Sequence, residues 1–305
     1  RAEFPARADV DTLPRPAYTG EPAATPGEPL QHYHNTIAPV RQWAAAPESL
    51  PPSAHEWRHE LTARTSTLEI VRPDVTRGAI RHALFDFDGT LSLIREGWQQ
   101  VMAPLMVAVL AETPRAEPEA RLREAVRDYI DRTTGVQTIY QMIGLADMVR
   151  ERGGEPLEPA EYKQRYLDGL WERIKDRVAG LREGRIPRRD LMVPGAEEVL
   201  AGLAARGVRC YLASGTDVEF VRDECAALGL AGYFWQIHGA IADYRSYSKA
   251  QVIRQILSEY DVQGHQLVTF GDGFVEIEET VKAGGIAVGV ASDEAGRSGA
   301  VDAWK

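Results

Sequence analysis

Hydrophobic positions along this chain follow two spacings, one typical of short buried strands and one typical of amphipathic helices. Apolar runs that predict strands lie at residues 83–85, 208–213, 233–238, 267–271 and 286–290. Among the later runs, residues 197–206, 218–227 and 249–257 space their apolar side chains three or four positions apart, which predicts helices. Strands that alternate with helices favour a parallel sheet with helices on both faces, so we expect an α/β fold.

A long helical stretch separates the first predicted strand from the second. Helix-spaced apolar residues occupy 98–111, 117–131, 136–152 and 159–178, with breaks at Gly153, Gly154 and Gly180. We therefore expect residues 93–192 to be an all-α insertion. The two chain segments around it, 79–92 and 193–305, are expected to form one α/β core.

Residues 1–78 differ from the rest of the chain because they are rich in proline, which interrupts helices. They predict an extended arm, with a short helix near residues 36–46 and a strand near residues 67–71.

Two carboxylates follow the first predicted strand, in the sequence Asp86-Phe87-Asp88-Gly89-Thr90. Side chains two positions apart in an extended segment point the same way, so Asp86 and Asp88 are expected to converge. Like charges this close repel unless a cation lies between them, and Mg²⁺ takes carboxylate and carbonyl oxygens. Taken alone, the segment is also compatible with a solvated acidic turn.

Three further polar groups stand at the end of a predicted strand or the start of a predicted helix. They are Ser214-Gly215-Thr216 after the second strand, Lys249 before a helix, and Asp272, followed by Glu276 and Glu278, in an acidic loop after a later strand. Each has an ordinary alternative as a helix cap, a surface lysine or a turn residue. Ligands of parallel sheets bind beyond the carboxyl ends of the strands, so we expect these groups to share one site with Asp86.

In this order the four motifs resemble those of the haloacid dehalogenase (HAD) superfamily, over roughly residues 80–291. The resemblance implies a Rossmann-like HAD core with an all-α C1 cap after the first strand, and phosphoryl transfer through an aspartyl-phosphate. It makes Asp86 the nucleophile and Asp88 the general acid and base. It assigns Ser214, Gly215 and Lys249 to the phosphate oxygens. Thr90, which offers a hydroxyl, and Arg95, which follows the first motif, are our further substrate-binding candidates.

The resemblance also implies a Mg²⁺ cofactor. Its ligands would be Asp86, the backbone carbonyl of Asp88, and Asp272. Many relatives have an Asp where this chain has Glu276, whose longer side chain is expected to hold a metal-bound water.

Asp88 narrows the choice of reaction within the superfamily, because dehalogenases and phosphonatases lack this residue. We therefore expect a phosphatase, broadly phosphoglycolate-phosphatase-like, acting on a small phosphorylated metabolite such as a sugar phosphate or phosphoglycolate. A phosphomutase and a catalytically silent binding domain are the alternatives. Residues 133–141 are a candidate specificity loop or a simple interhelical turn, and Trp98 is a further candidate to face the substrate.

Composition removes some partners from consideration. A formal net charge of -10 argues against a general nucleic-acid binder, which needs a basic face. No apolar stretch reaches the roughly 18 residues of a membrane helix, and we expect a cytoplasmic protein with both cysteines reduced and buried.

Family members continue with a further helix and strand, so we also expect the natural chain to extend beyond Lys305. The oligomeric state is left open.

Overall fold

The computed structural model describes residues 69–75 and 78–292, all of which belong to one compact unit, Pro52–Lys305. The predicted helix near residues 36–46 lies outside the described residues, as does most of the predicted arm. The predicted strand near residues 67–71 is wrong for its described part, because residues 69–71 form no strand.

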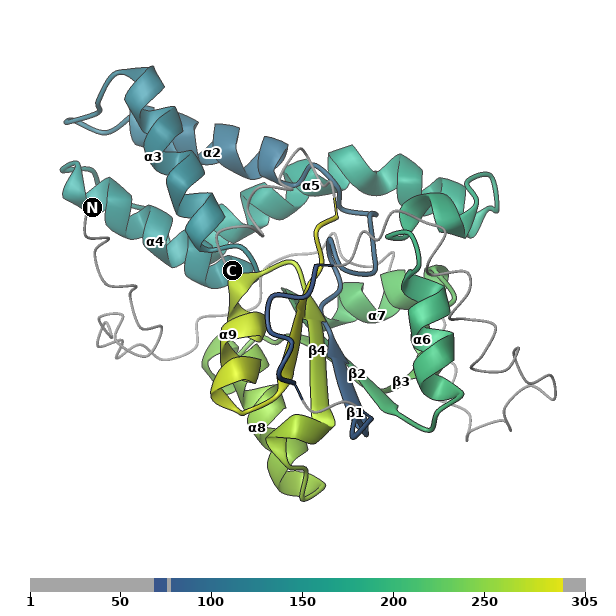
Figure 1. The fold of residues 1–305 in the computed structure, drawn as a ribbon. Coiled ribbons are helices and arrows are strands. Elements are labelled where there is room, and N and C mark those ends of the chain that lie inside the picture. The colour runs from purple at the N-terminus through teal and green to yellow at the C-terminus, as the bar shows by residue number, and fades with distance from the viewer. Residues whose placement is uncertain (1–68, 76–77, 293–305) are drawn as a thin grey trace. The chain divides into compact units, whose positions relative to one another are not determined.

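The core of the fold is a five-stranded parallel sheet with the strand order β3-β2-β1-β4-β5 (Figure 1). In chain order the strands are β1 (His82–Phe85), β2 (Arg209–Asp217), β3 (Phe234–Ala240), β4 (Leu267–Gly271) and β5 (Ile286–Gly289). The last residue of β1, Phe85, pairs with Leu212 of β2 and with Phe270 of β4. The residue after it, Asp86, therefore enters the space beyond the ends of two neighbouring strands, as the sequence predicts.

Both faces of the central strands β1, β2 and β4 are mostly buried, so these strands read as continuous apolar runs. Ala83 and Phe85 belong to the core that also contains the buried side chains of α6 (Ala196–Ala204) and α7 (Val218–Ala227). Leu84 points to the other face, where it packs with buried residues of α8 (Lys249–Glu259). Figure 1 shows α8 and α9 (Phe274–Lys282) together on one side of the sheet.

Four helices are inserted between β1 and α6, as the helix-spaced pattern predicts. They are α2 (Gln99–Ala111), α3 (Glu119–Arg132), α4 (Thr138–Glu151) and α5 (Pro159–Arg182). Their buried apolar residues, which include Met106, Leu110, Val126 and Met142, belong to the same continuous core as Ala83 and Phe85. Short 3-10 turns lie at Arg188–Leu191, between α5 and α6, and at Ala231–Tyr233, Tyr244–Ser246 and Gly264–Gln266 in the core.

Two local predictions need correction. Gly180 does not end α5, which continues to Arg182. The missing side chain of Gly180 instead leaves room for Ile186, 2.8 Å from where a Cβ would stand. The acidic loop after β4 is short, because residues from Phe274 onward form α9. Glu276 therefore stands in the first turn of a helix, where a carboxylate is favoured.

Cys210 of β2 and Cys225 of α7 are both buried and free, as expected. Burial raises the pKa of each thiol to about 12. Neither thiol is therefore ionised at neutral pH. Among the described helices, none combines the length and the apolar composition needed to cross a membrane.

Candidate active site

The turn after β1 fixes the two carboxylates of the first motif. The backbone N–H of Asp86 donates to the carbonyl of Phe270 at 2.9 Å, which ties the end of β1 to β4. Phe87 is fully buried, and its carbonyl accepts the N–H groups of Leu91 and Ser92, both at 2.9 Å. The side chain between the carboxylates thus anchors the turn in the core while both carboxylates face the site.

Lys249, the first residue of α8, lies between two buried carboxylates. Its Nζ is 2.9 Å from Oδ1 of Asp86 and 2.8 Å from Oε2 of Glu276. Glu276 is also fixed from behind, because its Oε1 accepts the N–H of Gly273 at 2.9 Å. We call Lys249, Asp86 and Glu276 the lysine cluster.

Burial and charge act in opposite directions within the lysine cluster. Burial raises the pKa of Asp86 to about 6, although the neighbouring ammonium of Lys249 lowers it. Burial also disfavours the charge of Lys249, yet Asp86 and Glu276 together raise the pKa of Lys249 above its usual value. The lysine is therefore charged at neutral pH.

Asp272 joins this cluster from the loop after β4. One carboxylate oxygen from each of Asp86, Asp272 and Glu276 lies within 4.8 Å of the others. Three convergent carboxylates, two of them buried, are the oxygen donors that a hard divalent cation takes. The donor set therefore fits Mg²⁺, with Glu276 in the same group as the two aspartates.

Asp88 has different partners from Asp86. Its Oδ2 accepts the hydroxyl of Thr216 at 2.9 Å and lies 3.5 Å from the hydroxyl of Ser214. Its Oδ1 has no hydrogen bond among the described residues and lies 3.9 Å from Nε of Arg95. Burial raises the pKa of Asp88, and the positive charge of Arg95 only partly opposes this.

Arg95 is held mainly by another carboxylate. Its Nη2 donates to Oε1 of Glu224 at 2.7 Å, and its Nε lies 3.1 Å from both oxygens of Glu224. Both side chains are buried, with relative exposures of 8% and 5%. We call Arg95, Glu224 and Asp88 the arginine cluster.

The segment between α3 and α4, residues 133–141, lies against the site. Gln137 donates from Nε2 to the carbonyl of Tyr247 at 2.7 Å and to that of Tyr244 at 3.2 Å. A Cβ on Gly215 would stand 2.9 Å from the carbonyl oxygen of Val136, so only glycine fits there. This segment lines a cavity of about 70 Å³ that Asp86, Asp88 and Lys249 also line.

Most of the residues predicted from the sequence meet at this cavity. Asp86, Asp88, Arg95, Ser214, Gly215, Lys249 and Asp272 line it, as does Trp98. Thr90 is buried, and its hydroxyl has no hydrogen-bond partner among the described residues. Glu278 lies apart, in an exposed pair with Lys282 at 3.3 Å. Arg95 is expected from the sequence to bind substrate, but its guanidinium is already paired with Glu224.

Sequence reasoning missed three residues that shape the site. Glu224 lies on the same buried side of α7 as Val221 and Cys225, and a carboxylate in an apolar stripe is a signal that could have found it. Thr216 stands in the second motif, but no spacing marks it as a partner of Asp88. Tyr247 donates its hydroxyl to the carbonyl of Ser214 at 2.7 Å, an interaction with no local sequence signal.

A family model matches more than half of the chain. Its description is a haloacid dehalogenase-like hydrolase, and it covers residues 80–284. A search of curated proteins gave no match.

Several solved structures also match. A predicted phosphoglycolate phosphatase from Haemophilus somnus is 15% identical, with a TM-score of 0.47, over 70% of this chain and 86% of that one. A β-phosphoglucomutase from Clostridium difficile is 14% identical, with a TM-score of 0.49, over 69% and 84%. CbbY from Rhodobacter sphaeroides, solved with phosphate, is 22% identical, with a TM-score of 0.45, over 68% and 84%.

Proposed function

The chain belongs to the haloacid dehalogenase-like hydrolases, and we propose that it is a Mg²⁺-dependent phosphatase that hydrolyses a small phosphomonoester through an aspartyl-phosphate. One observation supports this most strongly. Asp86 and Asp88 leave the same turn but have separate partners, Lys249 for the first and Thr216 with Arg95 for the second. Separate environments allow one carboxylate to act as a nucleophile while its neighbour exchanges a proton.

In the first step the carboxylate of Asp86 attacks phosphorus. A bond forms between its oxygen and phosphorus, and the bond from phosphorus to the leaving oxygen breaks. With a pKa near 6, Asp86 is mostly ionised at neutral pH. The ammonium of Lys249, 2.9 Å away, compensates charge when an anionic nucleophile meets an anionic substrate.

Asp88 handles the protons of both steps. It gives a proton to the leaving alkoxide, and then accepts one from the water that attacks the phosphorus of the aspartyl-phosphate. That attack breaks the bond to Asp86 and releases phosphate. The raised pKa of Asp88 suits this exchange, and Thr216 orients the carboxylate oxygen that it contacts.

Asp86, Asp272, the carbonyl of Asp88 and Glu276 would hold Mg²⁺. When bound, the ion would neutralise charge on the phosphoryl oxygens and on the ligand carboxylates. Ser214 and the N–H of Gly215 are proposed to bind the phosphoryl oxygens together with Lys249. The N–H of Thr216 is already taken by Oγ of Ser214 at 3.1 Å, which keeps that hydroxyl oriented.

We propose that residues 93–192 act as a cap over a core made of residues 79–92 and 193–305, with residues 1–78 as an arm. The contacts of Gln137 and Gly215 support this, because they hold residues 133–141 against the core beside the carboxylates. The cavity of about 70 Å³ leaves little room for a metabolite, so we propose that the cap moves as the substrate enters. A covered site favours a small phosphorylated metabolite over a protein, with residues 133–141 as the specificity loop. A cytoplasmic location stays a prediction.

A panel of sugar phosphates, phosphoglycolate and other phosphomonoesters tests this function, with phosphate release measured in the presence of Mg²⁺. The expected result is release from at least one ester, and loss of that release in Asp86→Asn. Conversion between sugar phosphate isomers without net release would identify a phosphomutase instead. No turnover of any ester would favour a silent binding domain, and would contradict the proposal.

A further inference from the structure

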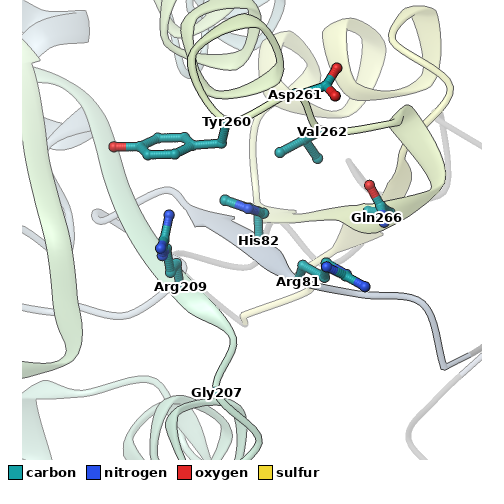
Figure 2. A pocket seen from close by; sticks show the side chains of 8 residues that line it. All are labelled: Arg81, His82, Gly207, Arg209, Tyr260, Asp261, Val262 and Gln266. Atoms are coloured by element: carbon teal, nitrogen blue, oxygen red, sulfur yellow. The ribbon is translucent and has the colours of Figure 1, made fainter.

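A second, larger cavity lies at the opposite ends of the strands from Asp86. Its volume is about 580 Å³, and Figure 2 shows the eight residues that line it. Arg81 and His82 are at the start of β1, Arg209 is at the start of β2, and Gln266 directly precedes β4. Tyr260, Asp261 and Val262 follow the end of α8. The proposed catalysis uses none of these residues.

Two arginines make this cavity electropositive. Among the residues that the structure describes, neither Arg81 nor Arg209 forms an ion pair. The one acidic residue of the lining, Asp261, directs its carboxylate away from Arg209 in Figure 2. Lys249 and Arg95 in the active site are buried against acidic partners, whereas Arg81 and Arg209 are exposed and pair with no described carboxylate. The positive charge of Arg81 and Arg209 is therefore available to an anion from solution.

The guanidinium of Arg209 is held in place without being neutralised. It lies 5.1 Å from the ring centre of Tyr260 and 5.2 Å from that of Trp235. The indole N–H of Trp235 donates to the hydroxyl of Tyr260 at 3.1 Å, which links the two rings. Rings orient a guanidinium by cation–π contact but leave its N–H donors available.

His82 forms the buried wall of the cavity. It is 6% exposed, and its Nδ1 lies 3.1 Å from the hydroxyl of Tyr211. Figure 2 shows the ring between Arg81 and Arg209. Burial lowers the pKa of His82, and the positive charges of Arg209 and Arg81 lower it further. An anion bound between the arginines would reverse this electrostatic effect, so His82 is a built-in reporter of occupancy.

We propose that this cavity is a binding site for a small phosphate-bearing anion, separate from the active site. A planar guanidinium matches phosphate oxygens in charge and in fork geometry, and the cavity lining offers two, on either side of His82. The ring of Tyr260 and the side chain of Val262 give an apolar wall for the organic part of a phosphate ester. The volume lies within the range of about 300 to 1,000 Å³ that small-molecule sites occupy.

The test is an NMR titration of the histidine ring protons of the full chain with inorganic phosphate, repeated across pH at constant ionic strength. The spectrum of His82→Gln identifies the His82 signal, or that of Tyr211→Phe if the first variant does not fold. We expect phosphate to raise the pKa of His82, and chloride at the same ionic strength to have no effect. Arg81→Gln and Arg209→Gln should each weaken the phosphate response by at least about tenfold, the scale of one charged hydrogen bond.

Two matched variants make the result specific. Arg254→Gln removes a positive charge from the exposed side of α8, outside the cavity, and should leave the phosphate response of His82 unchanged. Lys249→Met disrupts the active site and should also leave it unchanged. An unshifted His82 at saturating phosphate would overturn the proposal, as would a response that survives in Arg209→Gln or disappears in Lys249→Met. The outcome is independent of whether the chain hydrolyses any ester.

Discussion

The lysine cluster and the arginine cluster each contain one basic side chain, one aspartate and one glutamate, but they place the basic side chain differently between the two carboxylates. Each has one buried cation between two carboxylates. Lys249 is shared almost equally, 2.9 Å from Asp86 and 2.8 Å from Glu276. Arg95 is committed to one side, with an N–O distance of 2.7 Å to Glu224 and 3.9 Å to Asp88.

The difference follows from what each cation can do. A lysine ammonium is a compact charge with three rotatable donors, so it can shift between Asp86, Glu276 and an arriving phosphoryl group. A guanidinium is a rigid fork, and its paired hydrogen bonds to Glu224 fix its position. We infer that the lysine cluster lets Lys249 compensate charge as the phosphoryl group arrives and leaves. The arginine cluster instead holds Asp88 at a set distance from a fixed cation.

The largest effect is expected for Asp86→Asn. An amide cannot form an acyl-phosphate, so turnover should be abolished while the fold survives. Steady-state phosphate release checks the activity, and circular dichroism checks the fold. Residual activity within about tenfold of the wild type would show that Asp86 is not the nucleophile.

Removal of the metal should be nearly as severe. We expect EDTA to abolish activity, Mg²⁺ to restore it, and Ca²⁺ to inhibit, because Ca²⁺ prefers more ligands and tolerates poorer geometry. Asp272→Asn should weaken Mg²⁺ binding more than Glu276→Gln if Glu276 acts through a water molecule. Equal effects would instead place Glu276 among the direct ligands, as its position within 4.8 Å of Asp86 and Asp272 allows. Full activity in excess EDTA would contradict the metal assignment.

Lys249→Met should lower kcat/KM by at least about a hundredfold, the effect expected when a preorganised site is deprived of one charged interaction. Lys249→Arg should fail nearly as badly, because a planar fork does not fit between Asp86 and Glu276 as an ammonium does. The control is Lys282→Met, which removes an exposed lysine from α9 and should change little. Steady-state kinetics with the best substrate of the panel measures all three variants. If Lys249→Met kept most of the activity, the lysine cluster would be structural.

Glu224→Gln tests the arginine cluster, and we expect a smaller loss, about tenfold in kcat. Without the negative charge of Glu224, Arg95 should move toward Asp88 and lower its pKa, so that Asp88 holds its proton less favourably. KM should change little, since Glu224 does not line the cavity. Glu219→Gln, on the exposed side of the same helix, is the matched control. Equal effects of the two changes on kcat would show that Arg95 does not position Asp88.

The smallest effect concerns the pH profile of the lysine cluster. The pKa of Asp86 is raised to about 6, so the carboxylate is ionised above this pH and protonated below it. At limiting Mg²⁺ we expect kcat/KM to fall as the pH drops through about 6. Saturating Mg²⁺ favours the ionised form and should move that fall to lower pH. If the pH profile did not change with the Mg²⁺ concentration, protonation of Asp86 would not be the cause of the fall in kcat/KM at low pH.

The sequence predicts most of the framework of this molecule, because every strand and every helix except α9 has its own periodic signal. Asp86 and Lys249 are predictable because each stands at the end of such an element. The partnership of Arg95 with Glu224 is not, since it joins residues 129 positions apart and depends on how α7 packs. The extent of α9 escapes prediction because the glycines and glutamates after β4 are typical of a loop. Likewise, the hydrogen bond of Gln137 to Tyr247 depends on how the helical insertion folds back on the core.

The central claim is that Asp86 forms a covalent acyl-phosphate intermediate while Asp88 handles protons. Asp88→Asn isolates this step, because the variant keeps the nucleophile but has no base to activate water for the second step. The measurement is acid quenching of this variant with the best substrate, followed by peptide mass spectrometry. The account predicts phosphate on the peptide that contains Asp86, and none in Asp86→Asn. Phosphate on another residue, or turnover in Asp88→Asn at the wild-type rate, would contradict it.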